Sequence, residues 1–222
     1  FFDVDAPAEE IEKLIDDKTK MIFTETIANP SIKVLDFGKI AGIAKKYGVL
    51  FFVDNTLATP ALCRPFEFGA NIVIHSSSKY LDGHAAALGG VIVDGGNFGF
   101  KGNPRYVSFN EPDESYHGLV YADLPAAPFA NKCRAQLVRD MGAIMSPQNA
   151  FISFLGCDTL ALRMERHCSN AQKIAEFLEH RVHCRFGGLG QYAGRRRVIQ
   201  IMHNKTNSLP GAPSCVAAHL LL

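Results

Sequence analysis

The chain has 222 residues, of which 47% are hydrophobic, and its formal net charge at pH 7 is +1. This length can bury a sizeable core in one large domain or two small ones, as an enzyme requires. The near-neutral charge gives no general reason to expect a nucleic acid or an acidic membrane surface as partner, and no apolar run reaches the roughly 18 residues of a membrane span. We therefore expect a small-molecule partner.

The cysteines predict the compartment in which the protein works, and the start of the chain suggests that it is part of a longer protein. Six cysteines are scattered without CxxC spacing, so the sequence suggests neither a metal site nor a disulfide framework, and reduced thiols predict a cytoplasmic protein. The first residues lack the basic and apolar regions of a signal peptide. Because the chain begins with Phe1 and not with methionine, we expect it to be an interior piece of a longer protein.

Helical and strand patterns alternate at short intervals in the first half, which predicts an α/β fold with a largely parallel sheet flanked by helices. Two helices are expected over residues 5–17 and 36–47, and a short helical piece over residues 63–68, before Gly69. Short apolar runs of the buried-strand type predict four strands, at residues 20–24, 49–53, 71–74 and 89–93.

The second half begins with a stretch of little periodicity. Residues 104–128 are rich in proline, aspartate, serine and tyrosine, which predicts a long surface loop of the kind that is often functional. Helical periodicity returns over residues 130–141 and again over 146–180, where we expect a break near Gly156. This pattern predicts that residues 1–145 are part of a large ligand-binding domain and that 146–180 begin a smaller C-terminal one.

The last 42 residues, 181–222, contain six lysines and arginines and no acidic residue. Subtraction from the totals of 23 basic and 22 acidic residues leaves 17 and 22 in the first 180 residues, a net charge of −5. This shift and the loss of periodicity predict a divergent tail that is disordered or results from a translation-frame error. The alternative is a basic nucleic-acid-binding arm around Arg195 to Arg197.

Polar motifs follow three of the predicted strands: ETIANP at 25–30, DNT at 54–56 and HSSSK at 75–79. The carboxyl ends of parallel strands share one edge of a sheet, where open α/β folds bind ligands, so we expect these motifs to converge on one ligand. Asn29 and Asp54, and likewise Asp54 and Lys79, are 25 residues apart, which is about one βα unit.

These motifs contain the groups that pyridoxal 5′-phosphate (PLP) requires: an amine for a Schiff base, an acid beside the pyridine nitrogen and donors for the phosphate. Lys79 supplies the amine and Asp54 the acid. Ser76 and Ser78 offer hydroxyl donors, and Asn29 is placed to bind near the phenolic oxygen. Individually, an aspartate after a strand is more often a cap or turn residue, and a Ser-Ser-Ser-Lys run is more often a solvated loop. Their joint placement favours the cofactor site.

The strings ETIANP, VDNTLATPALCRPFEFGANIVIHSSSKY and GGVIVD resemble the Cys/Met-metabolism PLP enzymes, whose pattern is Asp-Asn-Thr followed by His-Ser-x-[Thr/Ser]-Lys. Residues 111–118, 146–151 and 162–167 are most similar to the O-acetylhomoserine sulfhydrylases within that family. The resemblance covers residues 1–180 and implies the type I fold of PLP-dependent transferases, the aspartate aminotransferase-like fold, truncated at both ends.

The resemblance also implies residue roles and a reaction. Lys79 is the catalytic and cofactor-bearing lysine, and the rest of the implied PLP site consists of Asp54, Ser76, Ser78, Asn29 and Thr56. The implied reaction is γ-replacement on O-acetyl-L-homoserine with sulfide or a thiol, which gives homocysteine or methionine plus acetate. Full-length members of the family are usually homotetramers of dimers that share active sites.

Other groups of the family site cannot be assigned to residues of this sequence. Its phosphate loop and ring-stacking tyrosine are expected upstream of Phe1, and its carboxylate-binding arginine beyond the region of similarity. Glu25, His84 and His117 are secondary candidates that have structural interpretations at least as strong. The alternatives are a sister activity, such as cystathionine γ-synthase or methionine γ-lyase, and a catalytically inactive fragment that acts at most as a binding module.

Overall fold

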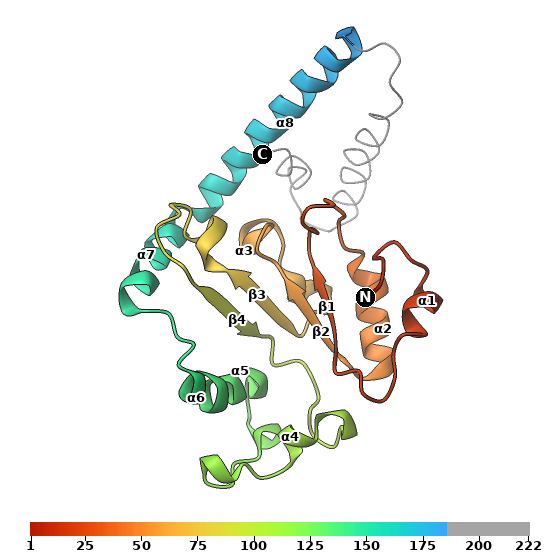
Figure 1. The fold of residues 1–222 in the computed structure, drawn as a ribbon, viewed down its shortest axis with the longest axis vertical. Helices are drawn as coiled ribbons and strands as arrows, with labels where there is room; N and C mark the ends of the chain where they lie inside the picture. The colour runs from red at the N-terminus through yellow and green to blue at the C-terminus, as the bar shows by residue number, and fades with distance from the viewer. Residues whose placement is uncertain (186–222) are drawn as a thin grey trace.

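The computed structural model describes residues 1–185, and a four-stranded sheet forms its centre (Figure 1). The strands lie in the order β1-β2-β3-β4. The first three are parallel, whereas β4 runs antiparallel to β3. Each strand lies within one or two residues of its predicted position: Met21–Glu25 (β1), Leu50–Asp54 (β2), Ile72–Ser76 (β3) and Gly90–Asp94 (β4). The expected α/β fold with a mostly parallel sheet is confirmed.

The helix between β1 and β2 forms where its end signals predict it. In α2 (Phe37–Tyr47), the Asp36 carboxylate accepts a hydrogen bond from the Lys39 amide at 3.1 Å, and Gly48 ends the helix with a φ of +63°. The helix expected over residues 5–17 is shorter, since α1 spans only Ala8–Glu12. Downstream of α1, the Asp16 side chain accepts from the amides of the next turn and so competes with helix formation.

Different elements cover the two faces of the sheet. On one face, α2 packs against the strands, with the Phe37 and Phe51 rings 6.2 Å apart. The opposite face carries Phe52, whose ring lies 5.8 Å from that of Phe129 at the start of α5 (Pro128–Lys132). Between β2 and β3 lie α3 (Thr59–Leu62) and a 3₁₀ turn (Pro65–Phe68). The sheet is thus the middle layer, and each face belongs to its own hydrophobic core.

The expectation that residues 104–128 form a long surface loop is wrong for three of their four aromatic residues. Tyr121 is fully buried, and Tyr106 and Phe109 are nearly so. They form the second core with Phe100, which stacks on Phe109 at 4.1 Å. The segment folds into four short helical pieces: Pro104–Tyr106, Val107–Asn110 (α4), Glu114–Tyr116 and Tyr121–Asp123. Aromatic burial, which periodicity does not report, holds this segment against the sheet.

Asp113 connects parts of this segment through its side-chain hydrogen bonds, and its protonation gives a testable prediction. Its carboxylate accepts hydrogen bonds from the Tyr121 hydroxyl at 2.6 Å, the Ser115 hydroxyl at 2.7 Å and the Gln136 amide at 2.7 Å. Hydrogen bonds, that of Tyr121 first, lower the pKa of Asp113 to about 2. Since the unfolded value is about 3.9, the stabilisation is present above pH ~4 and is lost as the pH falls towards 2.

The expected result is therefore a pH-dependent difference between the parent and Asp113→Asn. The parent should resist urea better than Asp113→Asn at about pH 6, and the gap should shrink steadily below about pH 4. Urea unfolding at a series of pH values measures this, with Glu114→Gln, an exposed neighbour, as control. A gap of constant size from pH 6 to 2 would contradict the assignment.

The last part of the described chain is helical, as expected. α5 continues through a π-helical stretch (Cys133–Val138) into α6 (Arg139–Met141). The Ser146 hydroxyl caps α7 (Pro147–Asp158), and α8 (Leu160–Arg185) follows after a break at Thr159, three residues from Gly156. In Figure 1, α8 runs away from the sheet. It includes the first five residues of the expected tail; the remainder, with Arg195 to Arg197, lies outside the described residues.

Candidate active site

The carboxyl ends of three parallel strands bring the predicted motifs together. Glu25 pairs with Asp54 across β1 and β2, and Asp54 pairs with Ile74 across β2 and β3. Because side chains alternate along a strand, Ser76 faces the same side of the sheet as Ile74. Glu25, Asp54 and Ser76 therefore share one face at one edge of the sheet, as the sequence predicts for the three motifs.

Hydrogen bonds through Asn55 fix the loop after β2. Asn55 is completely buried; its side-chain oxygen accepts from the Thr26 hydroxyl at 2.7 Å, and its amide donates to the Cys63 carbonyl at 2.8 Å. The Thr26 amide also donates to the Asp54 carbonyl at 2.9 Å. The sequence identifies Asn55 only as part of the DNT motif and does not predict these hydrogen bonds. The bond to Thr26 joins Asn55, which directly follows β2, to the residue that directly follows β1.

Asp54 and Thr56 flank Asn55 and make hydrogen bonds of their own. The half-buried Asp54 carboxylate accepts from the Thr56 amide at 2.9 Å. The Thr56 hydroxyl accepts from the Ser76 amide at 2.8 Å, so it ties the DNT loop to the end of β3. Thr56 therefore links two of the three motifs directly, and its place in a cofactor site stays a prediction.

Lys79 lies in a π-helical turn, Ser77–Leu81, that follows β3 directly. The backbone leaves helical geometry at Lys79, with φ −100° and ψ −123°. The lysine is exposed, and its amine makes no hydrogen bond or ion pair with residues 1–177. An amine of this kind is available to a ligand.

The serines before Lys79 differ in their contacts. The Ser78 hydroxyl accepts from the Gly89 amide at 2.9 Å and donates to the Gly89 carbonyl at 3.3 Å. It can donate to a phosphate only by leaving that carbonyl. Within the described residues, the half-buried Ser76 hydroxyl has no hydrogen-bond partner. Ser76 is thus the hydroxyl donor that is ready for a ligand at this edge.

Asn29 lies beyond the end of β1, and its side chain is exposed. Its backbone N–H donates to the Glu25 carboxylate at 2.8 Å, and the Asn29–Pro30 peptide bond is cis. This contact supports the structural interpretation of Glu25, which anchors the loop that carries Asn29. The structure places Asn29 near the same edge as Asp54, and its contact with a cofactor stays a prediction.

The histidines are less suited to catalysis at this edge. His75 is buried and, by alternation along β3, faces the side of the sheet opposite to Asp54. Burial lowers the pKa of His75, an effect that the Asn55 backbone and the Asp54 charge offset only in part. His75 is therefore a neutral structural residue. His84 and His117 are exposed, and the His84 Nδ1 lies 2.6 Å from the Asp82 carbonyl oxygen.

The donor set fits PLP. PLP requires an amine, a carboxylate and hydroxyl donors. Lys79 offers an amine without other partners, Asp54 a carboxylate at an adjacent strand end, and Ser76 an unpartnered hydroxyl. Among the side chains that the structure describes, residues 1–177, no three or more His, Cys, Asp or Glu residues form a cluster that could hold a metal ion. None of the described helices is long and apolar enough to cross a membrane.

Arg163 is a functional candidate that sequence reasoning missed. Its guanidinium reaches from α8 to the Lys79 turn and donates to the Tyr80 carbonyl at 2.8 Å and the Leu81 carbonyl at 3.3 Å. The residue lies in the stretch 162–167 that carries part of the family resemblance, but residue type alone gives no sign of a partner 83 positions away. Only the fold brings the two segments together.

Comparisons with known proteins match the chain to one enzyme family. The family model described as Cys/Met metabolism PLP-dependent enzyme matches residues 1–195. The chain is 45% identical over 183 residues to a homocysteine/cysteine synthase of Kluyveromyces lactis, covering 81% of this chain and 41% of the relative. It is 47% identical over 166 residues to an O-acetyl-L-homoserine sulfhydrylase of Corynebacterium glutamicum, covering 73% and 38%.

A solved structure is similar as well. The crystal structure of a putative O-acetylhomoserine (thiol)-lyase from Campylobacter jejuni, with N′-pyridoxyl-lysine-5′-monophosphate, gives a TM-score of 0.77 at 43% identity, over 80% of this chain and 44% of that one. These matches confirm the resemblance and the fold predicted from the sequence. The chain spans about two fifths of the length of the curated relatives it matches.

Proposed function

Because the chain belongs to the Cys/Met metabolism PLP-dependent enzyme family, we propose that the protein catalyses γ-replacement on O-acetyl-L-homoserine with sulfide or a thiol. The products are homocysteine, or methionine when the thiol is methanethiol, and acetate. The relatives named as homocysteine synthases and O-acetylhomoserine sulfhydrylases support this choice of substrate. The observation that carries the proposal is the unpartnered Lys79 amine, which follows the strand beside Asp54 at the ligand-binding edge of the sheet.

In this proposal Lys79 holds PLP through its amine, Asp54 holds the pyridine nitrogen protonated, and Ser76 and Ser78 donate to the phosphate. Asn29 and Thr56 complete the set. PLP, when bound, draws electrons away from the substrate carbon atoms and so makes their protons removable. Residues 1–145 then belong to the cofactor domain, and the segment from 146 begins the smaller one.

The protein's own part of the chemistry is proton movement and orientation. The Lys79 amine, released when substrate occupies the site, would take the proton from Cα and pass it on to the bound substrate and cofactor; neutral again, it would then take one from Cβ. The bond between Cγ and the acetate oxygen breaks, a bond between Cγ and sulfur forms, and Lys79 returns protons to carbon. O-acetylhomoserine and hydrogen sulfide together contain the atoms of homocysteine and acetic acid, so no oxidant or reductant is needed.

The setting of the reaction is also proposed. Cys63, Cys133 and Cys157 are free thiols, which fits a reducing cytoplasm. Burial raises the pKa of Cys63 to about 12, so this thiol is unreactive. We place the protein in the cytoplasm as a homo-oligomer, with a small-molecule substrate and with neither nucleic acid nor membrane as partner.

The test uses the intact protein with added PLP. A visible absorbance band should appear, and borohydride reduction followed by peptide mapping should find the label on Lys79. With O-acetyl-L-homoserine and sulfide, the protein should release homocysteine and acetate in equal amounts. A label spread over surface lysines such as Lys101 would contradict the cofactor site, and cleavage of methionine or cystathionine without γ-replacement would contradict the substrate assignment.

A further inference from the structure

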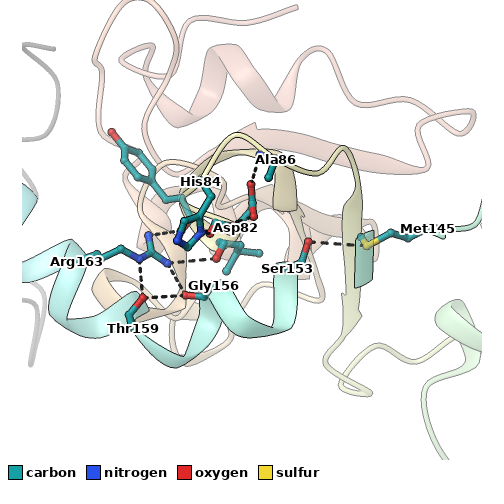
Figure 2. Close-up of polar contacts among 10 residues, drawn as sticks. Asp82, His84, Ala86, Met145, Ser153, Gly156, Thr159 and Arg163 are labelled. Atoms are coloured by element: carbon teal, nitrogen blue, oxygen red, sulfur yellow. Dashed lines mark hydrogen bonds and ion pairs between the residues drawn. The ribbon is translucent and has the colours of Figure 1, made fainter. Parts of the chain in front are cut away.

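We propose that Arg163 is a positioning residue for Lys79: from α8 it fixes the π-helical turn that presents the amine. The inference rests on the proposed function, because it takes Lys79 as the amine that binds PLP. Figure 2 shows Arg163 reaching towards Gly156 and Thr159, with Asp82 and His84 close by.

Four acceptors surround the Arg163 guanidinium. Two belong to the Lys79 turn, the carbonyls of Tyr80 and Leu81, at 2.8 Å and 3.3 Å. The others are the Gly156 carbonyl, at 2.6 Å, and the Thr159 hydroxyl, at 3.0 Å. The backbone acceptors are carbonyls at the ends of two helical segments, which lack a helical partner and carry partial negative charge. One planar cation therefore fastens the end of the Lys79 turn to the end of α7.

Two glycines permit this approach. A Cβ on Gly156 would lie 2.2 Å from the Asp82 carbonyl oxygen and 2.6 Å from that of Leu81, so α7 touches the turn backbone to backbone. A Cβ on Gly83 would lie 2.4 Å from an Arg163 nitrogen. The Gly156 contact involves only backbone atoms and does not depend on the placement of the Arg163 side chain. It is independent evidence that α7 and the Lys79 turn meet without space for a side chain at position 156.

Hydrogen bonds to residues of the following loop also hold the Lys79 turn. The Asp82 amide donates to the Ser77 carbonyl at 2.9 Å, and the buried Asp82 carboxylate accepts from the Ala86 amide at 2.9 Å. The Ser77 amide donates to the Gly89 carbonyl at 3.0 Å. These contacts lie within one loop of the chain, whereas Arg163 makes polar contacts that connect the turn to α7 and α8.

Three variants of the intact protein test the inference. Arg163→Leu removes all four hydrogen bonds, and Gly156→Ala forces the turn away from α7 while Arg163 stays. Arg163→Lys retains the charge and the stem but offers one nitrogen in place of a planar fork. The matched controls are Arg166→Leu, an exposed arginine of α8, and Gly42→Ala, a helical glycine with open space around it.

Two measurements separate positioning from folding. The first is hydrogen exchange of the amides of residues 77–83 without PLP. The second is the initial rate at which borohydride-trapped PLP accumulates on Lys79. Arg163→Leu and Gly156→Ala should exchange faster and label Lys79 at least about tenfold more slowly, the effect of one hydrogen bond to a charged group. Arg163→Lys should fall between these variants and the parent, and the controls should match the parent.

Arg163→Lys is the decisive variant if the others do not fold, because it conserves charge and size. Labelling of Lys79 at the parent rate in Arg163→Lys, or in a folded Arg163→Leu, overturns the inference, even if exchange rises. The outcome for the proposed function is separate. If the parent itself does not label Lys79, that function fails, whereas the exchange data still report whether Arg163 fixes the turn.

Discussion

Replacement of Lys79 with alanine is expected to lower the rate of γ-replacement by at least about 10²-fold, since a positioned base contributes about 10²–10⁴-fold. The loss should be larger than that of a base alone, because the same amine holds the cofactor. The side chain is exposed and has no hydrogen bond or ion pair among the described residues, so its removal should leave the fold intact. Release of acetate from O-acetyl-L-homoserine, measured with saturating PLP, gives the rate.

The matched control for Lys79 is Lys101→Ala. Lys101 is another exposed lysine, and it forms an ion pair with Asp123 at 2.8 Å. This variant should retain the parent rate. Addition of a small primary amine should restore part of the activity of Lys79→Ala, because it supplies the missing base. Equal losses in Lys79→Ala and Lys101→Ala would show that the site has been misassigned.

Asp54→Asn is expected to reduce kcat/KM by about 10²–10³-fold, the usual cost of removing one preorganised electrostatic contact from an active site. The amide oxygen of asparagine can still accept from the Thr56 amide, as the Asp54 carboxylate does at 2.9 Å. The substitution therefore removes the negative charge and should conserve the conformation of the loop after β2. The expected pattern is a slow reaction, a changed absorbance spectrum of bound PLP and an unfolding temperature close to that of the parent.

Glu25→Gln distinguishes Asp54 from its neighbour. Glu25 is paired in register with Asp54, faces the same side of the sheet and also accepts a backbone hydrogen bond, from Asn29. Glutamine conserves that acceptor. Glu25→Gln should therefore retain most of the activity and the parent's spectrum. A loss in Glu25→Gln as large as that in Asp54→Asn would mean that the wrong carboxylate has been assigned to the pyridine nitrogen.

Local signals suffice to predict much of this fold. Asp36 and Gly48 mark both ends of α2, and the apolar runs before Asp54 and His75 mark buried strands, because caps and buried strands depend on residues close in the chain. Periodicity failed where aromatic side chains supply the stability. Tyr121 and Phe109 pack into a core with no helical or strand period, so their segment looked like a surface loop.

The same distinction divides the site. The positions of Lys79, Asp54 and Ser76 could be predicted because each lies at or just beyond the carboxyl end of a strand, and parallel strands end at one edge. The roles of Asn55 and Arg163 could not. Asn55 acts through a hydroxyl 29 positions away, and Arg163 through carbonyls more than 80 positions away. Contacts of this kind depend on tertiary packing, which a single sequence does not reveal.

The 83 residues between Tyr80 and Arg163 also set an order of events on the ribosome. At synthesis rates of about 5–20 residues per second, Arg163 emerges about 4 to 17 seconds after the segment that carries Lys79. All four strands have been made by then, so the sheet is able to assemble while the lysine turn still lacks its anchor. Capture of the vitamin-derived cofactor at this lysine is therefore expected late in biogenesis, after α8 has docked.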